Sequence, residues 1–494
     1  MNLLLLLDMA AAGRADEVAI QAGDETLTAA QLLQAAWGAA AVVGDAEALA
    51  YVGTNSLAFP IGLFGAAAAG VPFVPLNYRL SHDQLHELLA PLGSVLVVAE
   101  GDAATALAER GHQVMAIDDF VAASRTDVAV GEPADVGGDE PAVLLYTSGT
   151  TSAPKAAVLR HRHLTAYVIG TVEYGGADPD SAVLVSVPAY HVAGLANLLS
   201  NLYAGRRIVY LRQFEPQQWV EAVRSEAITN AMVVPTMLSR ICDLVEADGQ
   251  GLPSLKALSY GGARTPAVVL QRVMDLLPEL DLTNAYGLTE TSSTIAVLTP
   301  DDHRSARDGD PVWIGRLSSA GKVLPTIEIE IRDDDGKVVG DGEPGEIWVR
   351  GEQVSGEYKG REALLDAEGW FPTRDRGWLD DDDYLFIEGR ADDTIIRGGE
   401  NIAPAEIEEV LLRHPDIEEC AVVGVPDDEW GQRIAAVVVT REGVELDVVA
   451  VQDFARQALR GSKTPDVVSF AANLPYTETG KLLRREVLAD LQST

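Results

Sequence analysis

The sequence predicts an α/β fold, with a large N-terminal domain of parallel-sheet α/β subdomains plus a β-rich subdomain, and a small C-terminal α+β domain. Three observations lead to this prediction. A chain of 494 residues is too long for one hydrophobic core. Up to residue 286, Ala/Leu-rich helical runs alternate with short apolar strands, which is typical of a mostly parallel sheet covered by helices. Further on, glycine-punctuated β segments dominate, before a separate α+β pattern begins.

The parallel part is predicted from short apolar runs between helical segments. A Gly/Asp/Pro-rich connection at 130–141 leads into the apolar run 142–146, which feeds directly into the loop TSGTTSAPKAA. A strand followed by a polar loop is therefore expected there. The other strands of this part are expected at 48–52, 94–99, 182–187, 207–211, 231–234 and 257–260.

The β-rich subdomain is expected over 313–389, with β segments at 327–332, 345–350 and 384–387. The remaining chain reads as an independent unit. Its expected elements are a helix at 404–414, strands at 419–424 and 433–440, a helix at 447–459 and a basic tail. We therefore divide the chain into an N-terminal domain, 1–388, and a C-terminal domain, 389–494.

Composition narrows the possible partners. The formal net charge is -38, and such a surface repels nucleic acid and anionic lipid, so neither is an expected partner. Cys242 and Cys420 lie far apart without metal-ligand spacing, which excludes a disulfide framework and favours a reducing cytoplasm. The start, MNLLLLLDMA, is too short for a membrane span and is expected to form an amphipathic helix, so no stable membrane insertion is expected. A homodimer is a reasonable expectation for a soluble enzyme.

The segment YTSGTTSAPK, residues 146–155, is the strongest local motif. Backbone N–H groups, hydroxyls and the Lys155 ammonium can together cradle phosphate oxygens. The segment does not match the P-loop pattern, so a kinase or GTPase fold is not implied. A polar surface turn is the alternative interpretation, because Ser/Thr/Gly clusters are common in turns.

Three further motifs are weak when taken singly. In NAYGLTE, residues 284–290, a tyrosine can stack on a purine and a glutamate can hold Mg²⁺, although one such glutamate is usually only solvated. Asp375 and Arg390 suit ribose hydroxyls and phosphate, or form a surface salt bridge. Lys481, on the glycine-bearing turn LPYTETGK, can act as a mobile cation, although an isolated lysine is usually solvated.

The order and spacing of these motifs resemble the adenylate-forming superfamily, which includes acyl-CoA synthetases, luciferases and the adenylation domains of peptide synthetases. The resemblance extends over 32–485 and looks closest to fatty-acyl-CoA ligases. It also rests on the segments NSLAFPIGLFGAAAAGVPFVPLNYRL, VPAYH, YGGA and IIRGGENIAP. It implies a carboxylic acid:CoA ligase that uses ATP, Mg²⁺ and CoA, with an N-terminal ATP- and acid-binding domain and a mobile C-terminal domain.

The resemblance implies roles for the nucleotide-binding residues. Tyr286 would stack on the adenine, Thr289 would touch the α-phosphate and Glu290 would bind Mg²⁺. Asp375 and Arg390 would hold the ribose. The remaining residues expected at the nucleotide are those of the phosphate loop and of the glycine segments beside the adenine: Thr147, Ser148, Gly149, Thr150, Thr151, Lys155, Gly261, Gly262, Ala263 and Gly287.

The resemblance also implies how the two steps would differ. Lys481 would bridge the acid carboxylate and the α-phosphate in the first step. The C-terminal domain would then turn about Asp392 and bring the loop of Gly398, Gly399 and Glu400 to the CoA thiol. The acid would lie near His191, which is expected either beside the acyl carboxylate or only packed behind it. Other residues expected at the acid are Val192, Gly194, Val234, Pro235, Gly262, Gly287 and Thr294. Their segments carry no acidic side chain that would hold an amino group, so an apolar fatty, alicyclic or aromatic acid is favoured.

Three positions depart from the family pattern, which has glycine where this chain has Ser152, Ala156 and Arg374. These changes are expected to affect rate rather than to abolish activity. Three functions remain open: the CoA ligase, a stand-alone enzyme that loads a carrier protein, and an inactive relative that binds ligands. Luciferase-like or other adenylate chemistry is a further alternative. The intact Lys155, Glu290 and Lys481 argue against the inactive relative.

Overall fold

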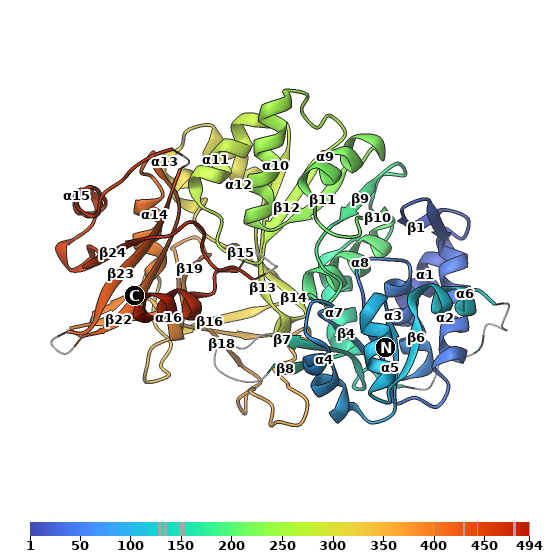
Figure 1. Cartoon of the computed structure of the whole chain (residues 1–494). Helices are drawn as coiled ribbons and strands as arrows, with labels where there is room; N and C mark the ends of the chain where they lie inside the picture. Colours follow the sequence, from blue (N-terminus) through green and yellow to red (C-terminus); the bar gives the residue numbers. More distant parts are fainter. Residues whose placement is uncertain are drawn as a thin grey trace.

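The computed structural model describes the whole chain except residues 127–130, 132–135, 148–153, 399, 428–429, 442, 478–480 and 494. Figure 1 shows the early elements α1–α6 at one end and the late elements α14–α16 and β22–β24 at the other. Strands β13 and β14, which carry several of the predicted site residues, lie in the middle of this view. Both strands belong to the larger of two main sheets in the described chain.

The smaller main sheet has the strand order β6-β5-β3-β4-β7-β8. Its pairs are parallel except for the antiparallel hairpin of β7 and β8, which encloses the phosphate-loop motif. All residues of β3 and β5 are buried, as expected where helices cover both faces of a parallel sheet. The strands are β3 (Ala48–Val52), β4 (Phe73–Leu76), β5 (Val95–Ala99), β6 (Gln113–Ala116), β7 (Pro141–Thr147) and β8 (Lys155–Arg160).

The larger sheet has the order β16-β17-β18-β19-β15-β14-β13-β12-β11-β9-β10-β1-β2. Its centre, from β10 to β13, is parallel, and the sheet becomes antiparallel from β14 onward. The strands of its parallel side are β1 (Val18–Ala22), β2 (Glu25–Thr28), β9 (Ala182–Val185), β10 (Arg207–Tyr210), β11 (Asn230–Val233), β12 (Ala257–Gly261) and β13 (Asp281–Leu288).

The predicted β-rich region is present, but it is hydrogen-bonded into the larger sheet. Strand β15 pairs with β14 on one side and with β19 on the other, so the sheet is continuous. The region still has its own hydrophobic cluster, which includes Ile331, Ile347 and Phe371. The strands are β14 (Ser293–Leu298), β15 (Gly321–Val323), β16 (Glu328–Arg332), β17 (Gly345–Arg350), β18 (Phe371–Leu379) and β19 (Tyr384–Arg390).

Helices form three layers around the two sheets. One hydrophobic cluster joins α1–α3, α7 and α8 to one face of each sheet, so these helices lie between the sheets. Helices α9–α11 cover the other face of the larger sheet, and α4 and α5 cover the other face of the smaller one. The helices are α1 (Leu4–Gly13), α2 (Ala29–Val43), α3 (Ala58–Ala69), α4 (His82–Leu89), α5 (Gly101–Glu109), α6 (Ile117–Ser124), α7 (His161–Thr171), α8 (Val192–Ala204), α9 (Pro216–Ser225), α10 (Pro235–Asp248), α11 (Ala267–Leu276), α12 (Pro300–Arg307) and α13 (Pro311–Arg316).

The leucine-rich start forms a helix, α1, as predicted. Leu3, Leu4, Leu6 and Leu7 are completely buried, so the apolar surface extends around more of the helix than one amphipathic stripe. The helix packs inside the core because its neighbours α2, α3 and α8 contact it on several sides. No helix within the described ranges is long and apolar enough to cross a membrane.

The C-terminal elements form their own small sheets and cores. The strands β22, β23 and β24 form one sheet, and β20 and β21 form a short hairpin. Clusters around Ile434 and Val437 fill the two faces of the three-stranded sheet. The elements are β20 (Ile395–Arg397), β21 (Glu400–Ile402), α14 (Pro404–Leu411), β22 (Ile417–Asp427), β23 (Gly431–Thr440), α15 (Val448–Ala458), β24 (Val467–Phe470) and α16 (Arg484–Ser493).

Candidate active site

Glycines bring strands β12 and β13 very close to their neighbours. A Cβ on Gly261 would lie 2.3 Å from the Ala285 carbonyl oxygen, and one on Gly287 would lie 1.8 Å from the Ser293 carbonyl oxygen. Gly262 follows with φ +80°, a conformation that favours glycine, and it is exposed like Gly287. Ala263 comes next and is partly buried. The carboxyl ends of these strands therefore expose backbone on which a planar group can lie.

Tyr286, Asp375 and Arg390 form one hydrogen-bonded group. The Tyr286 hydroxyl donates to Asp375 Oδ2 at 2.6 Å, and Arg390 Nε lies 3.0 Å from Asp375 Oδ1. Arg390 also donates to the Thr373 carbonyl oxygen at 3.1 Å. Burial and the Asp375 carboxylate raise the pKa of Tyr286, so the phenol keeps its proton and remains a donor. The structure thus brings together three residues that the sequence places 89 and 15 positions apart.

Glu290 has a partner that the sequence motifs did not indicate. The Tyr358 hydroxyl donates to its carboxylate, and the Lys155 ammonium lies 5.7 Å from the centre of the Tyr358 ring. The main chain around Tyr358 pairs with β8, since Lys359 N donates to the Ala156 carbonyl oxygen at 2.8 Å. Tyr358 therefore connects the expected Mg²⁺ carboxylate with the phosphate-loop lysine.

The phosphate loop itself lies mostly outside the described residues. Thr147 ends β7 and Lys155 begins β8, and the Thr147 hydroxyl donates to the Lys155 carbonyl oxygen at 3.4 Å. Ser148, Gly149, Thr150 and Thr151 fall in the undescribed part, as does Ser152. Ala156 is an ordinary paired residue of β8 and carries no backbone strain.

The short turn that carries Thr289 and Glu290 is held from two sides. Thr289 is partly buried at its start, and Leu288 N donates to the Thr291 hydroxyl at 3.0 Å. The Gln353 amide donates to the carbonyl oxygens of Thr291 at 3.0 Å and Thr294 at 2.8 Å. Gln353 is almost completely buried. It is a positioning residue that the sequence motifs missed, because it lies 62 residues further along the chain.

Lys481 lies close enough to His191 for its charge to lower the pKa of that histidine. His191 precedes α8, and its Nδ1 accepts a hydrogen bond from Ala193 N at 3.2 Å. Burial, and then the Lys481 charge, lower the pKa of His191 to about 4, so the ring is neutral near pH 7. Burial and the Arg390 charge lower the pKa of Lys481, while the carboxylates of Asp375, Asp393 and Glu290 oppose this shift.

The residues expected at the acid surround the same place. Gly194 lies in the first turn of α8, where a Cβ would meet the Pro188 carbonyl oxygen at 2.6 Å. Val192 is buried beside it. Val234 and Pro235 are buried at the junction of β11 and α10. Thr294, in β14, pairs with Gly287. These elements meet at the carboxyl ends of parallel strands, where open α/β sheets bind ligands.

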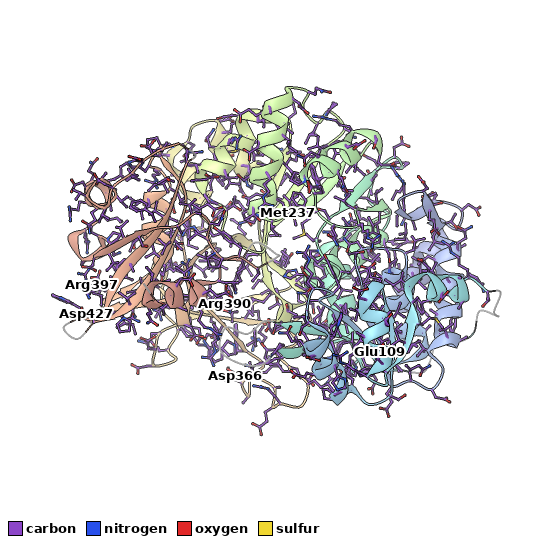
Figure 2. All side chains as sticks on the ribbon, viewed as in Figure 1. Glu109, Met237, Asp366, Arg390, Arg397 and Asp427 are labelled. Carbon is purple, nitrogen blue, oxygen red and sulfur yellow. The ribbon has the colours of Figure 1, made fainter. Side chains whose placement is uncertain are left out.

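The residues expected at CoA lie elsewhere in this structure. Gly398 has φ +58° and donates its N–H to the Trp430 carbonyl oxygen at 2.8 Å, and Glu400 lies in β21. Gly399 is outside the described residues. Figure 2 shows the neighbouring Arg397 at the outer side of the C-terminal elements, whereas Arg390 lies on the side facing the rest of the chain. Asp392 is exposed just after Arg390, in the connection between these two places.

The residues present fit a nucleotide-bound Mg²⁺ ion. Mg²⁺ usually keeps several waters and binds through one or two carboxylates together with substrate phosphates. Among the described residues, no three His, Cys, Asp or Glu side chains lie together so that they could hold a metal ion. Glu290, whose carboxylate accepts from the Tyr358 hydroxyl, is a carboxylate of this kind, and the nucleotide phosphates would supply other ligands.

Comparisons with known proteins agree with this geometry. The family model described as AMP-binding enzyme matches residues 7–359, and the AMP-binding enzyme C-terminal domain matches residues 406–481. The chain is 36% identical over 455 residues to a feruloyl-CoA synthase from an Amycolatopsis species, covering 91% of this chain and 89% of that protein. It is 32% identical to the fatty acid–[acyl-carrier-protein] ligase ScoC of Streptomyces coeruleorubidus, covering 91% and 87%.

A solved structure gives the same result. The O-succinylbenzoate coenzyme A synthetase MenE of Bacillus subtilis, in complex with ATP and magnesium ion, superposes with a TM-score of 0.85. The two share 28% identity, over 98% of this chain and 99% of that one. The chain belongs to the AMP-binding enzyme family, which is the adenylate-forming superfamily. Within it the chain is an acyl-CoA synthetase that uses ATP, Mg²⁺ and CoA.

Proposed function

We propose that the protein joins an apolar carboxylic acid, in particular an aromatic one, to CoA in two steps. The acid first forms an acyl-adenylate with release of pyrophosphate, and the CoA thiol then displaces AMP. The observation that carries this proposal is the convergence of Lys481, Glu290 and the Asp375–Arg390 pair on one place beside His191. The feruloyl-CoA synthase relative supports an aromatic acid.

The first step requires a carboxylate to approach an anionic α-phosphate. The Lys481 ammonium would contact both the acid carboxylate and the α-phosphate, and the Thr289 hydroxyl would donate to the α-phosphate. Mg²⁺, when bound at Glu290, supplies further positive charge and orients the phosphates. A preorganised donor of this kind is worth about 10²–10³-fold in rate. Because His191 is neutral and its Nδ1 accepts from Ala193 N, its Nε2 carries the proton and can donate a hydrogen bond at the acid without adding charge.

The nucleotide would be held by three groups of residues. Tyr286 and the exposed backbone of Gly261, Gly262, Ala263 and Gly287 would hold the adenine. Asp375 and Arg390 would hold the ribose, with the Tyr286 hydroxyl keeping the carboxylate in place. Lys155, with Thr147, Ser148, Gly149, Thr150 and Thr151, would bind the β- and γ-phosphates.

The second step needs different neighbours, since a neutral thioester forms and AMP leaves. We propose that residues 389–494 turn as a unit about Asp392. This turn would withdraw Lys481 and bring Gly398, Gly399 and Glu400 toward the thiol. Hinge motions of this type concentrate their φ/ψ changes at a few residues between elements. The exposure of Asp392, between β19 and the β20–β21 hairpin, is compatible with such a hinge.

Loading of a carrier protein is the second candidate function. The ScoC relative, named as a fatty acid–[acyl-carrier-protein] ligase, favours this alternative. Both functions share the adenylation step and differ only in the thiol that accepts the acyl group. Competition between CoA and a phosphopantetheinyl carrier protein for the same preformed adenylate separates them.

The test is an assay of the purified protein with ATP, Mg²⁺ and a panel of acids. The panel contains short and long fatty acids and aromatic and alicyclic acids, and pyrophosphate release is followed with and without CoA. The proposal expects an aromatic acid to yield acyl-CoA. Adenylate that CoA does not consume would support carrier loading, and no pyrophosphate with any acid would support the inactive relative. A homodimer and a cytoplasmic location stay predictions, and light scattering of the purified protein tests the former.

A further inference from the structure

A row of side chains crosses strands β11, β12 and β13 beneath the residues expected to hold the acid. In the sheet register, Met232 pairs with Ser259, and Ser259 pairs with Thr283. Paired residues of parallel strands point to the same face. The preceding residues of these strands, Ala231, Leu258 and Leu282, are buried against α9–α11. The Met232–Ser259–Thr283 row therefore points to the opposite face, the one that also carries α8.

Two hydroxyls in this row, those of Ser259 and Thr283, lie on interior strands without a hydrogen-bond partner among the described residues. Ser259 and Thr283 are partly exposed, although β12 and β13 are interior strands of the larger sheet. In the part of the chain that the structure describes, neither hydroxyl makes a hydrogen bond. Polar groups on an interior strand are normally satisfied by protein or by water. These two are consequently available to a ligand on this face of the sheet.

Asn197, from α8, extends the row with a third polar group. Arg206 Nη1, which can only donate, lies 3.2 Å from Asn201 Oδ1, so the Asn201 nitrogen points the other way. That nitrogen donates to Asn197 Oδ1 at 3.0 Å, which turns the Asn197 nitrogen toward Met232. There its partner is the Met232 sulfur at 3.2 Å, a weak acceptor.

The row lies at a defined distance along the strands from the glycines at the carboxyl ends of β12 and β13. Ser259 precedes Gly261 by two residues on β12, and Thr283 precedes Gly287 by four on β13. At the rise of a strand, these separations are roughly 7 and 13 Å. An acid whose carboxylate lies by His191 and Lys481 would reach the row with the far end of a rigid ring or a short chain. No member of the row is charged, so an uncharged oxygen substituent matches it best.

We propose that Asn197, Ser259 and Thr283 select an acid that carries a hydroxyl or alkoxy oxygen at the end remote from its carboxylate. The inference rests on the proposed function and deepens it, since it assigns the distal chemistry of the same substrate. The oxygen accepts from the Asn197 amide, which then no longer donates to the Met232 thioether. A substrate hydroxyl also donates to or accepts from the Ser259 and Thr283 hydroxyls, whereas an alkoxy oxygen only accepts from them. An acid with a purely hydrocarbon end leaves these groups unpaired.

The experiment compares matched acids in the full-length protein with ATP, Mg²⁺ and CoA. Cinnamic and 4-hydroxycinnamic acid form one pair, benzoic and 4-hydroxybenzoic acid form another, and octanoic acid represents an apolar chain. The measured quantity is the ratio of kcat/KM for the hydroxylated acid to that for its parent. One net hydrogen bond corresponds to about 3- to 10-fold in this ratio, so we expect at least about 10-fold for the better pair.

Ser259→Ala and Thr283→Val test the row itself. Each variant is expected to lower the ratio about 3- to 10-fold while leaving kcat/KM for the parent acid within about 2-fold. Ser254→Ala is the matched control, because the Ser254 hydroxyl donates to the Val223 carbonyl oxygen and so faces α9. It should leave the ratio unchanged. The parent acid reports on folding and on the reacting end in every variant.

The results distinguish a failure of the proposed role of the row from a failure of the proposed CoA ligase function. A ratio near one in the unaltered protein, or a ratio that neither Ser259→Ala nor Thr283→Val changes, overturns the role of the row. Turnover of octanoic acid in preference to every aromatic acid overturns it as well, while leaving the CoA ligase function intact. Absence of product from all five acids and from the wider panel instead contradicts the proposed function.

Discussion

The backbone is strained at Arg374, beside Asp375, the carboxylate expected to bind the ribose, and a substitution there can measure this strain. It has φ +63°, an uncommon conformation for a residue with a Cβ, and it immediately precedes Asp375. Its side chain is 64% exposed, and its contact with Glu346 is an ion pair of 3.9 Å. Such a long, exposed pair contributes little to stability. Glycine adopts this conformation without the steric penalty, so Arg374→Gly should relieve the strain.

The expected size follows from two opposing effects. The left-handed conformation costs roughly 1–2 kcal/mol for a residue with a Cβ. Glycine in turn gains about 0.4–1 kcal/mol of conformational entropy in the unfolded chain relative to alanine. Neither Arg374→Gly nor Arg374→Ala can form the ion pair with Glu346, so this pair does not contribute to the difference in stability between them. The glycine variant should therefore be about 0.5–1 kcal/mol more stable than the alanine variant.

Thermal unfolding of the two variants, at equal protein concentration, measures this difference. In a chain of this length, we expect a Tm about 0.5–1 °C higher for the glycine variant. The KM for ATP should stay within about 3-fold, because Asp375 remains bound to Tyr286 and Arg390. A glycine variant that is no more stable than the alanine variant would refute the strain argument.

Three further predictions concern charge. Because the pKa of Lys481 is lowered, adenylation should decline at a pH below that at which free lysine loses its proton, and Lys481→Arg should move this alkaline limb upward in a pH–rate profile. Burial lowers the pKa of His161 to about 4 and that of His163 to about 3, so the unfolded chain binds more protons below pH 6.5. The free energy of unfolding should then fall by up to about 1.4 kcal/mol per pH unit for each of these histidines as the pH drops toward 4, whereas a flat urea midpoint over this range would exclude it. Arg264 forms an ion pair with Glu409 of α14, so Arg264→Met should slow pyrophosphate release by less than about 5-fold. The charge-swapped double variant, Arg264→Glu with Glu409→Arg, should restore the rate. A loss beyond about 100-fold would show that Arg264 has a role other than this surface ion pair.

Local patterns were sufficient to place about half of the described strands, but few of the helices, at their residue ranges. Strands at 48–52 and 345–350 were predicted at the positions where β3 and β17 lie. The joining of the β-rich region to the larger sheet could not be predicted, because the pairing of β15 with both β14 and β19 depends on contacts between distant segments. Such pairings have no local signature, unlike the apolar runs that form each strand.

Some residues of the candidate site could be predicted from sequence motifs, and others could not. Glu290, Asp375 and Lys481 stand in recognisable motifs, and the structure brings them into one electrostatic neighbourhood. Tyr358 and Gln353 carry no motif, and their contacts with Glu290 and Thr291 appear only when the chain is folded. The role of Ser259 and Thr283 could not be predicted without the strand register. Successive residues of a strand point to opposite faces of the sheet, so the register decides whether a side chain faces the acid or α9–α11.

The central claim, that Lys481 serves adenylation and leaves during thioester formation, is tested most directly by measuring the two half-reactions separately in Lys481→Ala. Lys337→Ala, at an exposed turn, is the matched control. We predict that Lys481→Ala slows pyrophosphate release by about 10²–10³-fold, yet converts preformed acyl-adenylate and CoA into acyl-CoA within a few-fold of the unaltered rate. Equal loss in both half-reactions, or an undiminished first one, would contradict the account.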